Sequence, residues 1–349
     1  MTAMKISQYY SDKIRVMNFI SIVFVIFIHA PYTEAATHPL ALAVQRLLTD
    51  FGLAIFAVPL FFAISGMLFF NGIKKCADCL PKMYRRIYSL LIPYIIWNLI
   101  FVGWYAMMSL IPANANYVNS NVFEHVMQEN PLAILKILFV EPVAFHLWFL
   151  RDLMLYILLS PLILIGIKRV PWLLFLVLLV CLGWMPRLGI TYFVLGGIVS
   201  VHYSLEEIKS WLNNKTLVAL SVIYLSSAIA AALGFVYPGN VFYQYYVQVV
   251  GTVALLAVWG CYDLLVSKKR NISVLGSKIL SYTFFIYLFH EPAFNIIKKV
   301  GLKVLGIHDW SLIGLFLVNP FMIVVFAIGV GMLFRRLLPR VYSLCVGGR

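Results

Sequence analysis

The stretch IRVMNFISIVFVIFIHA, residues 14–30, is the first of the long apolar runs that make up most of the chain. About 20 apolar residues suffice to cross the hydrocarbon core of a bilayer as a helix. This run contains His29 near its far end. Ionisable side chains are unfavourable in hydrocarbon, so those found there usually face a bundle interior or a wet cavity. His29 is therefore the first candidate site residue.

The composition places the whole chain in the membrane-protein class. Of its 349 residues, 63% are hydrophobic and 11% are charged, and the mean hydropathy is +0.94. A soluble domain carries about 25% charged residues, so we predict an all-α integral membrane protein. Charged residues precede the first run and no cleavage site of the A-x-A kind follows His29, so we expect this run to be retained rather than removed as a signal.

The apolar runs predict about ten transmembrane helices in a single domain over residues 1–349. The predicted spans are 14–30, 53–70, 87–110, 148–167, 172–184, 190–203, 217–236, 241–266, 279–297 and 312–334. The fifth and sixth are short, and a re-entrant hairpin is the alternative for them. In the second span, the small residues of FFAISG, residues 61–66, predict close helix packing.

The charge distribution predicts the orientation. Most Lys and Arg residues fall in the loops on the side of the N-terminus, so the positive-inside rule places both termini in the cytoplasm. The net charge of +14 therefore reports topology and does not indicate a nucleic-acid partner. Of five cysteines only Cys76 and Cys79 form a close pair, with no second pair or nearby histidines, and we predict neither a disulfide framework nor a metal site.

Polar residues mark one face of the first span. Asn18 lies within about 20° of the helical stripe of His29, and Arg15 within about 40°. This stripe predicts a polar path from the inner surface to His29. The alternative is an interfacial histidine that reaches the outer headgroups.

Further polar residues come at similar depths in two other spans. His146 and Arg151 open the fourth span from the outer side, where an ordinary interfacial belt is the alternative interpretation. The ninth span adds Tyr287, His290 and Glu291. Three histidines on three helices favour a shared site.

Arginines stand at the inner start of the third span. Arg85 and Arg86 precede Pro93 and Tyr94. Arginines at this place can bind phosphates through charge-assisted hydrogen bonds. Positive-inside anchoring is the alternative.

Several of these stretches, taken in order, resemble the acyltransferase 3 family of bacterial membrane proteins, which mostly O-acetylate cell-surface sugars. The matching stretches, spread over essentially the whole length, are NFISIVFVIFIH (18–29), FFAISG (61–66), RRIYSLLIPY (85–94), HLWFL (146–150) and SYTFFIYLFHEP (281–292). Two positions depart from the family pattern. Asn18 stands where the family usually has an Arg, with Arg15 one turn away, and Tyr88 stands where a second Arg is frequent.

The resemblance implies a polysaccharide-modifying O-acetyltransferase of the bacterial cytoplasmic (inner) membrane. The acyl group, acetyl by this resemblance, would pass from cytosolic acetyl-CoA, an acyl-CoA donor substrate, to a hydroxyl of a cell-surface glycan or lipid-linked sugar. We expect no tightly bound cofactor and no metal; the expected partners are acyl-CoA, the glycan acceptor and membrane lipids. His29 would act as general base, because imidazole titrates near neutral pH; a transient acyl-histidine is a variant.

The expected roles divide the candidates into three groups. His29 and His146 would be catalytic, with His146 binding the acceptor or steadying the oxyanion. Donor contacts would come from Arg15, Asn18, Arg85 and Arg86, and acceptor contacts from Arg151, Tyr287, His290 and Glu291.

Two other functions fit the same composition. Many spans with buried polar groups also describe a transporter or flippase for a lipid-linked or small polar substrate, although we find no inverted repeats in the sequence. A membrane scaffold or sensor with a decayed active site is the third interpretation, and the missing motif Arg at Asn18 is its best argument.

Overall fold

The computed structural model describes residues 6–49, 51–109, 140–181, 189–236, 241–266 and 274–348. All regular elements in these ranges are helices, as the sequence predicts. The loop that separates the fifth and sixth predicted spans, and with it the choice between two spans and a hairpin, lies outside the described residues.

The chain forms two compact units, and it alternates between them. The first comprises Met1–Cys79 and Ser160–Ile328, and the second Leu80–Leu159 and Gly329–Arg349. Neither unit is one continuous segment, and the single-domain prediction for residues 1–349 stays a prediction.

The helices of the first unit are α1 (Gln8–His29), α2 (Pro39–Leu48), α3 (Ala57–Phe70), α8 (Ser160–Arg169), α9 (Pro171–Cys181), α10 (Gly189–His202), α11 (Leu205–Trp211), α12 (Asn214–Ala232), α13 (Val241–Leu265), α14 (Val274–Leu280) and α15 (Thr283–Leu305), together with most of α16 (Asp309–Leu337). The second unit contains α4 (Cys79–Ser109) from Leu80 onward, α7 (Trp148–Leu158), the end of α16 and α17 (Pro339–Cys345).

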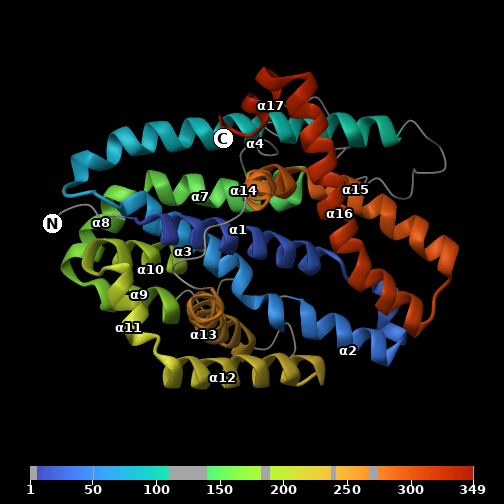
Figure 1. Ribbon diagram of the computed structural model, residues 1–349, viewed down its shortest axis with the longest axis horizontal. Coiled ribbons are helices and arrows are strands. Elements are labelled where there is room, and N and C mark those ends of the chain that lie inside the picture. The colour runs from blue at the N-terminus through green and yellow to red at the C-terminus, as the bar shows by residue number, and fades with distance from the viewer. Residues whose placement is uncertain are drawn as a thin grey trace. The chain divides into compact units, whose positions relative to one another are not determined.

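Helices α3 and α10 pack along each other so closely that their backbones come into contact (Figure 1). A Cβ atom on Gly66 of α3 would lie 2.0 Å from the carbonyl oxygen of Phe193, and one on Gly196 of α10 would lie 1.9 Å from that of Ala63. Only glycine allows such an approach. The packing role predicted for residues 61–66 is thereby confirmed.

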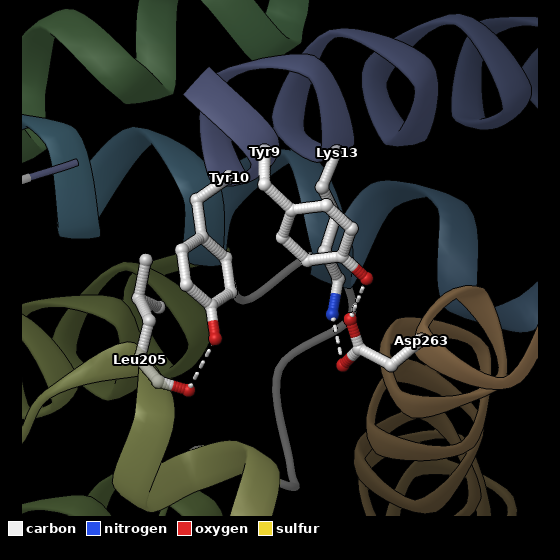
Figure 2. Close-up of polar contacts among 5 residues, drawn as sticks. All are labelled: Tyr9, Tyr10, Lys13, Leu205 and Asp263. Carbon is white, nitrogen blue, oxygen red and sulfur yellow. Dashed lines mark hydrogen bonds and ion pairs between the residues drawn. The ribbon is translucent and has the colours of Figure 1, made fainter. Parts of the chain in front are cut away.

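The first turns of α1 are bound to α13 by a buried ion pair. Figure 2 shows Lys13 and Tyr9 reaching the same carboxylate, with Lys13 Nζ 2.7 Å from Asp263 Oδ2 and the Tyr9 hydroxyl donating to Oδ1 at 2.5 Å. The hydroxyl of Tyr10 donates to the carbonyl oxygen of Leu205 in α11 at 3.2 Å. Charged side chains are almost never fully buried unless they are paired, and this pair holds the first turns of α1 against α13.

In the second unit, the C-terminal segment packs on α4. The indole of Trp97 donates to the carbonyl oxygen of Cys345 at 3.1 Å. Gly347 turns the chain with a φ of +66°, and a Cβ atom there would lie 2.0 Å from the carbonyl oxygen of Ser89. Both observations place the end of α17 and the residues after it against the middle of the long helix α4, close to Pro93.

By length and composition, five helical stretches in the described ranges are able to cross a membrane. They are Pro39–Phe70, Cys76–Met108, Asn214–Ala232, Tyr245–Leu265 and Asp309–Leu337, and counting Phe145–Leu158 with Ser160–Arg169 gives a sixth. Helices α1 and α15 are not among them, because charged residues interrupt their apolar character. The chain is a multi-pass membrane protein, while ten spans and the cytoplasmic termini stay predictions.

Candidate functional site

His29 is the last residue of α1, and its ring stacks on that of His290 in α15. The ring centroids are 5.5 Å apart and the planes differ by 26°. His29 is partly exposed, whereas His290 is fully buried. The ring of His29 is therefore turned toward another helix of its own unit.

A backbone hydrogen bond sets the tautomer of His290. Its Nδ1 lies 2.8 Å from the carbonyl oxygen of Tyr287, one turn earlier in α15. A carbonyl oxygen only accepts hydrogen bonds, so Nδ1 carries the proton and Nε2 of the neutral ring has the lone pair. The ring of Tyr287 lies beside that of His290 at 6.4 Å.

Glu291 and Lys298 are two of the charged residues that follow His290 on α15. Glu291 is 7% exposed, and one of its carboxylate oxygens accepts a hydrogen bond of 3.2 Å from Asn295. Lys298 lies two turns further on, on the same side of the helix, and interacts electrostatically with Glu291. The sequence analysis did not select Lys298; its signal was a lysine seven residues after a glutamate, a spacing that puts both on one side of a helix.

The N-terminal half of α1 carries two of the residues predicted to contact the donor, Arg15 and Asn18. The guanidinium of Arg15 donates to the backbone oxygen and the hydroxyl of Ser277 in α14, at 2.8 and 2.9 Å. Asn18 is partly exposed. Between Asn18 and His29 the same stripe holds Ile22 and Val25, which are buried. The polar stripe is thus interrupted by apolar packing for about two turns.

The second unit holds the remaining predicted site residues. His146 is 2% exposed and lies in a short 3-10 helix, with its ring 5.3 Å from that of Phe101 in α4. Arg151 binds the neighbouring carboxylate of Asp152 at 2.7 Å and donates to the carbonyl oxygen of Val140.

The two arginines predicted to hold phosphates lie side by side near the start of α4. Arg85 and Arg86 are both exposed. The Nε atom of Arg85 donates to the carbonyl oxygen of Pro81 at 3.3 Å, one turn earlier. Both side chains therefore reach the surface of the second unit.

The structure thus brings together His29, Tyr287, His290 and Glu291, while Arg15 lies about 21 Å away along α1 at 1.5 Å per residue. Among the residues that the structure describes, no group of three or more His, Cys, Asp or Glu side chains is arranged to hold a metal ion. The ring nitrogens of a stacked imidazole pair have the chemistry to accept and donate protons.

Comparisons with known proteins point to one family. A family model described as an acyltransferase domain matches residues 12–336, a range that includes His29, His146 and His290. The succinoglycan biosynthesis protein ExoH of Rhizobium meliloti (strain 1021) is 25% identical over 353 residues, which cover 97% of this chain and 92% of that protein. No solved structure is significantly similar to the chain.

Proposed function

This chain belongs to the acyltransferase 3 family, and on that basis we propose that it transfers an acetyl group from cytosolic acetyl-CoA to a hydroxyl of a cell-surface glycan or lipid-linked sugar. A glycan acceptor is supported by the name of the relative, a succinoglycan biosynthesis protein. The multi-pass architecture supports a location in the bacterial cytoplasmic membrane, with the donor on one side and the acceptor on the other.

The observation that carries the proposal is the stacked pair of His29 and His290. In the proposed step the acceptor oxygen attacks the thioester carbonyl carbon while His29 takes the hydroxyl proton. The C–S bond then breaks, and the coenzyme A thiolate receives that proton from the imidazolium of His29. No protein-bound acyl intermediate is required, and the atoms and charges balance over one transfer.

Donor binding is proposed for the basic residues near the inner surface. The exposed Arg85 and Arg86 have the chemistry to bind the phosphates of coenzyme A, since guanidinium groups form charge-assisted hydrogen bonds with phosphate. Arg15, with Asn18 one turn further along α1, offers a second donor contact.

Acceptor binding is proposed for residues on two helices. Tyr287 and Glu291 flank His290 on α15 and have the hydroxyl and carboxylate groups that bind sugar hydroxyls. In the second unit, His146 and Arg151 are proposed to bind the acceptor or stabilise the oxyanion.

The test uses purified protein in lipid nanodiscs with radiolabelled acetyl-CoA and candidate glycans. We expect label in the glycan fraction that depends on the protein and on His29. A protein that moves a lipid-linked sugar across proteoliposomes without changing it covalently would instead be a transporter or flippase. Absence of label transfer to every surface glycan of the source cell would overturn the proposal.

A further inference from the structure

The chain leaves α1 immediately after His29 in an irregular segment, Ala30 to Tyr32, before a short 3-10 helix begins at Thr33. The backbone N–H of Ala30 bonds to the carbonyl oxygen of Phe27 at 3.1 Å, which closes the last turn. The final carbonyls of a helix have no partner within it. Whatever holds this segment therefore determines where the ring of His29 lies.

Three side chains from three other helices hold the segment. Lys298 of α15 donates to the carbonyl oxygen of Pro31. The backbone N–H of Tyr32 donates to Gln45 of α2 at 3.1 Å, and its hydroxyl accepts a hydrogen bond of 2.6 Å from Asn319 of α16. Tyr32, Gln45 and Asn319 are at most 3% exposed. The exit of α1 is thus clamped within the first unit.

Lys298 is the charged member of this clamp. Its Nζ lies 4.9 Å from the centroid of the Tyr32 ring and 5.8 Å from that of Phe294, both within range of a cation–π attraction. The same ammonium interacts electrostatically with His29 and Glu291. One side chain therefore contacts the segment after His29 while being carried by the helix of His290.

Another lysine of α15 differs from Lys298 in its exposure. Lys303, about one turn further along α15, is exposed, whereas Lys298 is half-buried. An interfacial lysine that only reaches for headgroups would extend into water. Lys298 instead directs its ammonium toward a backbone carbonyl and an aromatic face.

We propose that Lys298 is a positioning residue for His29, because it binds Pro31 and covers Tyr32 and so holds the end of α1 against His290. The inference rests on the proposed function of His29 as general base. Misplacing a catalytic group by about 1 Å lowers a rate by about 100-fold, so this clamp would act on the chemical step and not on substrate binding.

The test compares Lys298→Met, Lys298→Arg and the exposed control Lys303→Met in the acetyl-transfer assay. We expect Lys298→Met to lower kcat by about 10- to 100-fold, with the KM of donor and acceptor nearly unchanged. Arginine keeps the donor and the cation–π contact, so Lys298→Arg should recover most of kcat. Lys303→Met should match the wild type.

Tyr32→Phe provides a mild second variant, because it deletes only the hydroxyl that Asn319 binds. We expect it to lower kcat in the same direction as Lys298→Met. A wild-type kcat in Tyr32→Phe beside a large loss in Lys298→Met would overturn positioning and assign Lys298 to the reactants directly. A wild-type kcat in Lys298→Met would also overturn it.

A readout independent of acyl transfer separates this inference from the proposed function. The rate at which diethyl pyrocarbonate modifies His29, followed by mass spectrometry, should rise in Lys298→Met and Tyr32→Phe and stay constant in Lys303→Met. If the wild type transfers no acyl group, the proposed function fails while this rate still tests the clamp. An unchanged rate in both clamp variants would reject the clamp.

Discussion

Lys13 and Asp263 form an ion pair with a separation of 2.7 Å, and their side chains are 0% and 6% exposed. The ammonium of Lys13 also lies 4.1 Å from the ring centroid of Trp259 in α13. Burying two charges is unfavourable unless the geometry is good and the remaining hydrogen bonds are made. Here Tyr9 takes the second carboxylate oxygen, so the pair binds the start of the His29 helix to α13.

Removing one member of this pair should destabilise the protein. Lys13→Met leaves the buried carboxylate of Asp263 without its cation, and we expect a loss of about 3–5 kcal/mol in unfolding free energy. The double variant Lys13→Met/Asp263→Asn removes both charges and should recover much of it. The melting temperatures of the wild type, the single variant and the double variant in detergent give the order of their stabilities. The exposed Lys215→Met is the control. Equal melting temperatures for Lys13→Met and the wild type would contradict a stabilising pair.

Methyl groups should not be tolerated where α3 meets α10. Gly66→Ala and Gly196→Ala each place a Cβ atom about 2 Å from a backbone carbonyl oxygen of the other helix, and such overpacking destabilises by about 1–3 kcal/mol or more. Gly314→Ala in α16 meets no atom within 4 Å and should stabilise by about 0.5–1 kcal/mol. The same melting assay distinguishes the two groups. Identical behaviour of all three variants would be incompatible with this packing.

Loss of the His29 imidazole should abolish activity without removing the protein from the membrane. For His29→Ala we expect a fall in acetyl transfer of at least about 100-fold, the lower end of the contribution of a general base. His38→Ala alters a histidine outside α1 and serves as the control. Western blotting of membrane fractions verifies equal amounts. Near-normal transfer by His29→Ala would remove this residue from the mechanism.

The arginines of α4 should act on donor binding. Arg85→Met or Arg86→Met should raise the KM for acetyl-CoA by about tenfold, since a hydrogen bond to a charged group contributes about 1.5–3 kcal/mol, and kcat should change less. Arg169→Met, an exposed arginine at the end of α8, is the control. Acetyl-dephospho-CoA lacks one phosphate of the donor. If that phosphate is the group that the arginine binds, the KM for this analogue should differ less between variant and wild type. A loss confined to kcat would argue against phosphate binding.

Much of the site could be predicted from single residues. His29, His290 and Glu291 stood out because ionisable side chains in apolar runs are unfavourable in lipid. The structure stacks His29 on His290, and Glu291 follows His290 on α15. The clamp was not predicted. Lys298 resembled one of several outer lysines, and Tyr32 and Asn319 are ordinary residues whose contact joins segments far apart in the chain.

The amino-acid sequence alone determined the helical membrane class and the small-residue helix contact around Gly66, and it singled out His29 as an ionisable residue in an apolar run, because hydropathy, helical period and residue size are local properties. Only the tertiary structure decided that His29 stacks on His290, that Lys13 pairs with Asp263 and that Lys298 holds Pro31. An apolar helix presents nearly equivalent faces to its neighbours, so partners are selected by the close packing and hydrogen bonding of distant segments.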